Sequence, residues 1–102
     1  MTKKDLNGDF PIAVHPGEIL QDWLKDCGAS QLKLARHLGV DPAKINEICR
    51  GKRGVSAEMA TALGRVFGVS AQMWLNMQKQ WELSQVDSSK YAHLKQLERI
   101  AA

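Results

Sequence analysis

Two residues spaced four positions apart restrict the folds open to this chain: Ala35 lies within a first helical pattern, and Gly39 separates that pattern from a second. The first pattern covers residues 31–38. The second begins at Asp41-Pro42, where an aspartate can cap a helix and a proline suits its first turn. A small side chain lets one helix cross another closely, and glycine accepts the positive φ that a tight turn requires. The spacing therefore predicts two short helices that cross steeply over a short turn.

The residues around this turn divide into an apolar set and an outward-facing set. The apolar set would bury both helices against the rest of the domain, and contains Leu34, Leu38, Val40, Ile45 and Ile48. The outward-facing set on the second helix contains Pro42, Ala43, Lys44, Asn46, Glu47 and Arg50. Because any two amphipathic helices share part of this pattern, a helical hairpin from an unrelated bundle is the alternative interpretation.

Apolar residues at helical spacing recur along most of the chain, and no segment of useful length alternates as a strand does. Further helices are predicted over about residues 16–27, 57–67 and 71–83, with a sixth beginning at Asp87 or Ser88. The predicted fold is all-α, with five to six short helices. We expect a flexible N-terminal lead over residues 1–11, a helix-turn-helix domain over 12–85 and a C-terminal helix over 86–102.

Positive charge is concentrated in one part of this 102-residue chain, which is long enough for a single domain. Residues 28–55 contain six basic and two acidic side chains, a net charge of +4. The net charge is −2 over residues 1–27 and +1 over residues 56–102. A local basic patch favours an anionic partner, most often nucleic acid, so we expect the second helix to dock in the major groove of DNA.

Several other classes of protein are disfavoured. No run of about 18 apolar residues is present to span a membrane, and the N-terminus lacks the apolar stretch of a secretory signal. A cytoplasmic protein is therefore expected. The three histidines are scattered, and no catalytic triad, Cys/His arrangement or phosphate loop accompanies them, so we do not expect an enzyme. A pure protein-interaction module, which would not need the basic face, is the other alternative.

Metal and cofactor sites are not expected. Cys27 and Cys49 stand far apart without a CxxC or Cys/His cluster, and are interpreted as small, partly buried thiols. The segment His15-Pro16-Gly17-Glu18 resembles a metal-binding pair only superficially, and is better explained as a helix start with an acidic first turn.

The motif resembles a known family. The residues that carry this resemblance are Ser30-Gln31, Leu34-Ala35, Leu38-Gly39-Val40, Ile45, Ile48 and Gly51-Lys52-Arg53, as in the phage-repressor-like (Cro, XRE) helix-turn-helix family. The flanking segments 15–20 (HPGEIL) and 73–78 (MWLNMQ) resemble the HigA group of antitoxins, which includes VapI-like proteins. The resemblance implies a homodimer that represses its own operon and neutralises a HigB toxin, an mRNA ribonuclease. A stand-alone XRE-type regulator without a toxin is the alternative.

The N-terminal half of the second helix would face base edges. Lys44 can donate to guanine, Asn46 can pair with adenine, and Ala43 can contact a thymine methyl group. For Lys44, contact with a phosphate is an equal alternative. Asp41 and Glu47 would repel phosphates unless they accept from cytosine or serve the helix itself, and Asp41 is foremost a cap.

Phosphate contacts are expected from the start of the first helix and from the loop after the second. Ser30 and Gln31 lie where backbone N–H groups and the helix dipole favour an anion. Lys33, Lys52 and Arg53 are further phosphate candidates.

The C-terminal part of the chain carries more apolar residues than a small domain readily buries. We expect Trp74 in the core and Trp81 in a dimer contact. Tyr91 and Leu94 extend this predicted interface, although with Leu97 they could instead fold back on the chain or meet a toxin. A dimer would hold two recognition helices about 34 Å apart, one turn of DNA.

Overall fold

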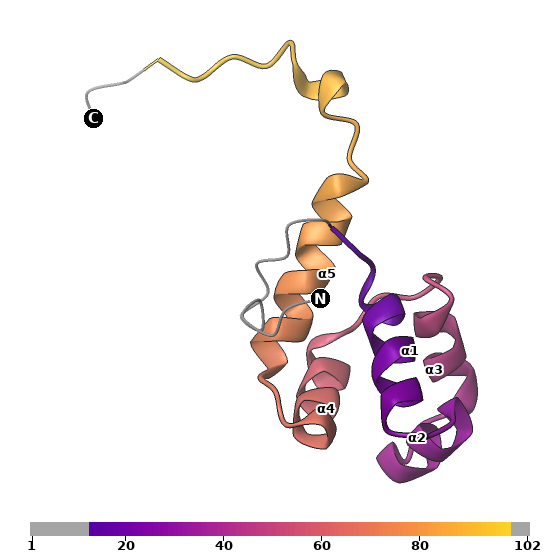
Figure 1. Ribbon diagram of the computed structural model, residues 1–102. Coiled ribbons are helices and arrows are strands. Elements are labelled where there is room, and N and C mark those ends of the chain that lie inside the picture. Colours follow the sequence, from indigo (N-terminus) through magenta and orange to yellow (C-terminus); the bar gives the residue numbers. More distant parts are fainter. Residues whose placement is uncertain (1–12, 99–102) are drawn as a thin grey trace.

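The computed structural model describes residues 13–98, and within them the secondary structure is entirely helical. Five α-helices follow one another: α1 (Pro16–Asp26), α2 (Gln31–Leu38), α3 (Pro42–Cys49), α4 (Ala57–Phe67) and α5 (Ala71–Ser84). In Figure 1, α1, α2 and α3 form one group, and α4 and α5 lie beside it. The all-α fold with five helices confirms the prediction from sequence.

Local signals in the sequence set the start of each helix. The side chains of Ser30, Asp41, Ser56 and Ser70 each accept a hydrogen bond from a backbone N–H in the first turn of the helix that follows. Such caps satisfy donors that have no partner inside the helix. Gly39 ends α2 with a φ of 71°, a left-handed conformation that favours glycine. The predicted cap at Asp41 and the predicted turn glycine, Gly39, are thus confirmed.

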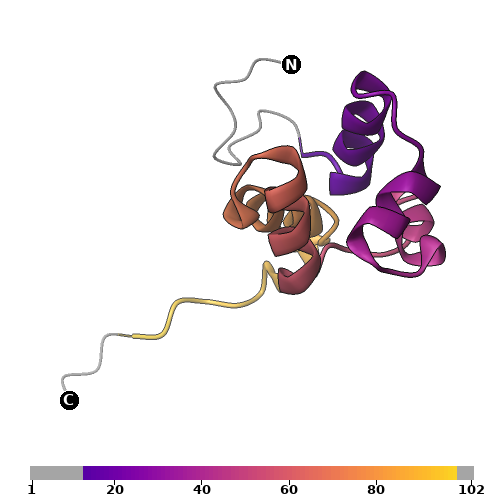
Figure 2. The same ribbon diagram turned by 90° about the horizontal axis from the view of Figure 1, so that it is seen from below.

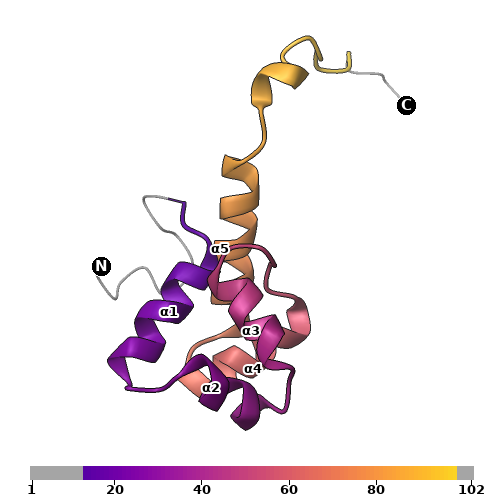
Figure 3. The ribbon, with the colours of Figure 1, turned by 90° about the vertical axis from the view of Figure 1, so that its right-hand side faces the viewer.

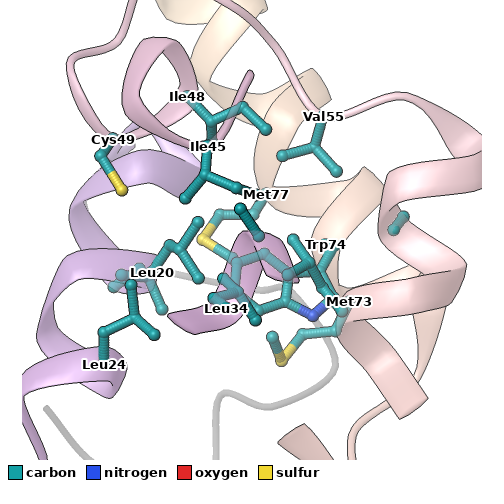
Figure 4. Packing of buried hydrophobic residues seen from close by; sticks show 14 residues of the cluster. Leu20, Leu24, Leu34, Ile45, Ile48, Cys49, Val55, Met73, Trp74 and Met77 are labelled. Carbon is teal, nitrogen blue, oxygen red and sulfur yellow. The ribbon is translucent and has the colours of Figure 1, made fainter. Parts of the chain in front are cut away.

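The core lies between the two groups of helices, and Trp74 of α5 is its largest fully buried side chain. Figure 4 shows Leu20 and Leu34, together with Ile45, converging on Trp74 and Met77 from the first group. The expectation that Trp74 belongs to the core is confirmed, since its exposed fraction is 0%. The α2–α3 pair is therefore fixed to the rest of the domain through its apolar face.

Helix α1 packs closely against the end of α3. A Cβ atom on Gly17 would overlap the backbone carbonyl oxygen of Ile48, so only glycine fits at this contact. One turn further along α1, the side-chain amide of Gln21 donates a 2.6 Å hydrogen bond to the carbonyl oxygen of Cys49. These contacts position α3 from the side opposite its exposed face. Figure 2, the view from below, shows α1 beside the α2–α3 pair.

The predicted C-terminal helix is wrong for the described residues. After α5 the chain forms a single 3₁₀ turn, Ser88–Tyr91, and then continues without regular structure. The carboxylate of Asp87 accepts from both the backbone N–H and the hydroxyl of Ser89, which favours a local turn. The apolar side chains in this segment have no surface to pack against, and Leu97 is 92% exposed. The predicted lead over residues 1–11 and residues 99–102 of the predicted helix lie outside the described residues.

The two cysteines have different environments, and neither forms a disulfide. Cys49 is buried, as expected, but Cys27 is exposed. The prediction of a partly buried thiol is therefore wrong for Cys27, because this residue follows the last residue of α1 and lies at the helix end rather than on its inner face.

Candidate nucleic-acid interface

Helix α3 has one buried face and one exposed face. Ile45 and Ile48 are 0% and 1% exposed on the buried side, and Ala35 of α2 is 0% exposed beside them. Ala43, Lys44 and Asn46 are exposed, as predicted. Figure 3 shows α2 and α3 as two separate helices that cross, rather than one continuous rod. The sequence pattern therefore identified both the crossing and the face that it leaves open.

Asn46 is linked to the preceding helix. Its side-chain amide donates a 3.1 Å hydrogen bond to the side-chain oxygen of Gln31, at the first position of α2. Two residues that the sequence assigned separately, one to bases and one to phosphates, thus form one exposed pair. The hydrogen bond orients both amides, which restricts the bases or phosphates that either one can reach.

Glu47 and Arg53 also form a pair. Arg53 Nε lies 2.7 Å from a carboxylate oxygen of Glu47, and the backbone N–H groups of Lys52 and Arg53 donate to the carbonyl oxygen of Glu47. Glu47 therefore holds the loop that follows α3. A contact of Glu47 with a base, or of Arg53 with a phosphate, would therefore have to form while the two side chains remain paired or would have to replace their ion pair.

Lys44 and Arg53 line the same hollow between α3 and α4. Its volume is about 260 Å³, and Ser56 and Glu58, at the start of α4, also line it. Its lining also includes apolar side chains, among them Val40 and Met59. The structure thus places Lys44, for which base and phosphate contacts were equal alternatives, at the same hollow as Arg53, a predicted phosphate contact.

Most of the positive charge around this face is unpaired among the described residues. Lys33, Lys44 and Lys52 are exposed and form no ion pair there, whereas Arg53 is paired with Glu47. Ser30 uses its hydroxyl oxygen to cap α2, accepting from the N–H of Lys33 at 3.0 Å. Asp41 caps α3 in the same way, accepting from the N–H of Ala43 at 2.8 Å. The capping role predicted for Asp41 is confirmed.

Comparison with known proteins decides the family. Residues 17–73, more than half of the chain, match the family described as "Helix-turn-helix domain". The chain belongs to the helix-turn-helix family. This range begins in α1 and ends in α5, so it includes the α2–α3 pair and the helices that hold it.

Proteins similar to this helix-turn-helix protein include a virulence-associated protein and an antitoxin. Virulence-associated protein I of Dichelobacter nodosus is 48% identical over 79 residues, which cover 76% of this chain and 73% of that protein. The antitoxin HigA of Pseudomonas aeruginosa, solved with the higBA promoter, is similar in structure with a TM-score of 0.79 and 37% identity. That match covers 86% of this chain and 100% of the other.

A second antitoxin structure extends the comparison. An addiction module antidote protein of the HigA family from Coxiella burnetii gives a TM-score of 0.78 at 29% identity, covering 83% of this chain and 98% of that one. The resemblance to the HigA group and to VapI-like proteins, noted from the flanking segments, is confirmed by these matches.

Sequence reasoning missed a buried glutamine in this helix-turn-helix protein. Gln78 of α5 is 5% exposed, and its side-chain oxygen accepts a 2.9 Å hydrogen bond from the backbone N–H of Val55. Its amide nitrogen donates to Glu82, and a Cβ atom on Gly54 would lie 2.8 Å from it. Gln78 thereby holds the loop between α3 and α4. The available signal was a polar residue next to Met77 on the apolar side of α5.

His15 occupies the helix start that the sequence predicted. Its Nδ1 atom accepts a 2.9 Å hydrogen bond from the N–H of Gly17, and its ring packs edge-on against Trp81 with centroids 4.8 Å apart. Burial lowers the pKa of His15, while Glu18 and a hydrogen bond with the backbone of Arg53 act in the opposite direction. The described residues contain no group of three side chains suited to hold a metal ion.

The residues predicted for dimer contact do not lie together in one chain. Trp81 is half-buried on α5 against His15. Tyr91 and Leu94 lie in the exposed segment that leads away from the helices (Figure 1). The predicted interface remains a prediction. Among the described residues, no helix is long and apolar enough to cross a membrane.

Proposed function

We propose that this protein is a sequence-specific DNA-binding repressor that acts on its own operon as the antitoxin of a HigB-like ribonuclease. The observation that supports DNA binding most directly is the exposed face of α3, which carries Lys44 above a buried face of Ile45 and Ile48. An α-helix presented in this way fits the major groove, and its N-terminal residues reach base edges. The protein would act in the cytoplasm, by binding rather than by catalysis.

The relatives support the biological setting of this proposal. One similar structure is the antitoxin HigA solved with the higBA promoter. The helix-turn-helix match in this chain includes α2 and α3. We propose the corresponding contacts here: Lys44, Ala43 and Asn46 toward bases, with Asp41 and Glu47 at the edge of that contact. Phosphates would be bound by the α2 start and the loop after α3, through Ser30, Gln31, Lys33, Lys52 and Arg53.

Two copies would bind a symmetric operator. Two recognition helices have to lie about 34 Å apart to enter successive major grooves on one face of DNA. We propose that Trp81, Tyr91 and Leu94 contribute to the contact between the copies. Large exposed side chains such as Tyr91 and Leu94, at 57% and 64% exposure, gain apolar burial when a second copy covers them.

An electrophoretic mobility shift with the promoter of the protein's own gene tests the proposal. The native protein should bind this DNA at least about a hundredfold more tightly than scrambled DNA. Lys44→Glu should abolish the preference without altering the circular dichroism spectrum, because Lys44 is exposed. Lys90→Glu, an exposed lysine in the segment after α5, is the matched control and should bind normally. Equal affinity for both DNAs would contradict the proposal.

Co-purification tests the antitoxin role separately. The product of the reading frame beside this gene is expressed with the tagged protein, and a stable complex that suppresses its ribonuclease activity is expected. A protein that binds its promoter but leaves its neighbour's product free and active would instead be a stand-alone regulator.

A further inference from the structure

A second candidate site lies beside α2 and shares no lining residue with the hollow between α3 and α4. A pocket of about 470 Å³ opens between the end of α1, helix α2 and the end of α4. Its apolar wall consists of Leu24, Ala29, Leu34, Val66 and Phe67. Pockets of this size and composition are typical of small-molecule sites, which combine apolar walls with a few polar groups.

The polar groups at this pocket are basic. Lys33, Arg36 and His37 of α2 line it, and no acidic side chain is among its lining residues. Lys33 and Arg36 are exposed and form no ion pair among the described residues. Cationic groups beside an apolar wall match a ligand that has an apolar body and an anionic end.

We propose that this pocket binds a small apolar carboxylate, such as a medium-chain fatty acid or an aromatic acid. The hydrocarbon part would cover Phe67 and Val66, and the carboxylate would lie against Arg36 and Lys33. Arginine can bind a carboxylate through two parallel N–H···O hydrogen bonds, which gives the geometry as well as the charge.

Binding here would weaken DNA binding, a consequence that rests on the proposed function. Lys33 lies in the first turn of α2 and is one of the proposed phosphate contacts. A carboxylate paired with Lys33 removes one positive charge from the DNA-binding face, and phosphate contacts contribute affinity through that charge. The ligand and the operator would therefore compete for the same side chain.

Direct binding can be measured without DNA, because Cys27 also lines the pocket. The exposed thiol of Cys27 should react with iodoacetamide, whereas the buried thiol of Cys49 should remain largely unmodified. Octanoate should slow alkylation of Cys27 in a saturable way and leave Cys49 unchanged. Octan-1-ol, with the same chain length but no charge, should protect about two- to fivefold more weakly, because ion pairs with exposed side chains contribute little. Equal protection by the acid and the alcohol would overturn the proposal.

A pair of arginine variants tests the charge contact. Arg36→Gln should weaken protection by octanoate about two- to fivefold and leave protection by octan-1-ol unchanged. Arg65→Gln removes an exposed arginine of α4 that does not line the pocket, and should behave like the native protein. Both side chains are exposed, so neither change should disturb folding. Unchanged octanoate binding in Arg36→Gln would refute the assignment.

Mobility shifts then separate this proposal from the proposed function. Saturating octanoate should raise the apparent Kd for the promoter several-fold, whereas octan-1-ol at the same concentration should not. A protein that binds octanoate but never binds its promoter overturns the proposed function and leaves the pocket assignment intact. A protein that binds its promoter but shows no octanoate protection overturns the pocket assignment alone. Protection without any change in Kd overturns the coupling through Lys33.

Discussion

Gly17 of α1 lies so close to Ile48 that the backbone carbonyl oxygen at the end of α3 occupies the space of a glycine's missing side chain. The Cα atom of Cys49 would also lie 3.0 Å from a Cβ atom at this position. Because both neighbours are backbone atoms, neither can rotate away as a side chain can. The position of the exposed helix thus depends on the absence of one methyl group.

Gly17→Ala should therefore destabilise the protein. Inserting a methyl group into a tightly packed contact typically costs about 1–3 kcal/mol, and a backbone clash lies toward the upper end. Thermal unfolding followed by circular dichroism measures the effect. Glu18→Ala, at the exposed neighbouring position, is the control and should change the free energy of unfolding by less than about 0.5 kcal/mol. An unchanged Tm for Gly17→Ala would contradict the close packing of α1 on α3.

Gln78→Met should destabilise the loop between α3 and α4. The substitution preserves the approximate size of the side chain but leaves the buried N–H of Val55 without its acceptor. An unsatisfied buried donor costs about 1–3 kcal/mol, measured by urea denaturation. Gln72→Met, on the exposed side of the same helix, is the control. Similar midpoints for the two variants would show that the hydrogen bond contributes little.

Lys44→Ala and Lys52→Ala should affect DNA binding differently. Loss of Lys44 should change the discrimination between operator variants, because we propose that it reaches a base edge. Loss of Lys52 should weaken binding to all DNA sequences alike, and should reduce the slope of log affinity against log salt concentration by about one. Titrations of both variants on the native operator and on single-base variants distinguish the two effects. If both bind like the native protein, the proposed surface is wrong.

The stability of the protein should depend on the protonation of His15. Burial lowers the pKa of His15 in the folded protein below its ordinary value of 6.5, so the unfolded chain binds the proton more tightly. The free energy of unfolding should therefore decrease as the pH falls below about 6.5, and level off below the folded pKa. Urea denaturation across this range measures the decrease.

The histidine responsible can be identified by substitution. His15→Asn, which retains a side-chain acceptor at the cap, should reduce this pH dependence. His37→Gln, at an exposed position, should preserve it. If the free energy of unfolding changes with pH equally in His15→Asn and in the native protein, His15 is excluded as the source of the pH dependence.

Tyr91→Asp combined with Leu94→Asp should convert a dimer into a monomer if the proposed contact is correct. Both side chains are exposed in the single chain, so their replacement removes apolar contact with a second copy without disturbing the helices. Sedimentation equilibrium measures the mass. Lys90→Asp, in the same segment, controls for added negative charge and should remain dimeric. A double variant with the dimer mass would exclude both residues from the interface.

The helices and the exposed face of α3 were predictable because their signals are local. Ser30 and Asp41 act within three residues of themselves, and Gly39 needs only its own backbone conformation. The division of α3 into buried and exposed faces follows from the 3.6-residue period, which placed Ile45 and Ile48 inside. These predictions did not depend on knowing how distant segments meet.

The contacts that the sequence did not reveal join distant segments. Gln78 meets Val55 across 23 positions, and Gln21 meets Cys49 across 28. Neither pairing leaves a periodic pattern, since a glutamine on a helix is ordinarily solvated. The predicted C-terminal helix failed for a related reason: Tyr91, Leu94 and Leu97 have the spacing of a helical face but no surface to pack against.

In α3, the residues that hold the helix in place differ from the residues on its exposed face. Asp41 and Pro42 begin it, and Ile45 and Ile48 anchor it, whereas the side chains of Ala43 and Lys44 make no hydrogen bond or ion pair within the described residues. Mutations at those two positions can therefore accumulate at little cost to folding. With Ala43 and Lys44 contacting bases, as we propose, a lineage built on this scaffold can acquire a new target sequence without first having to regain a stable protein.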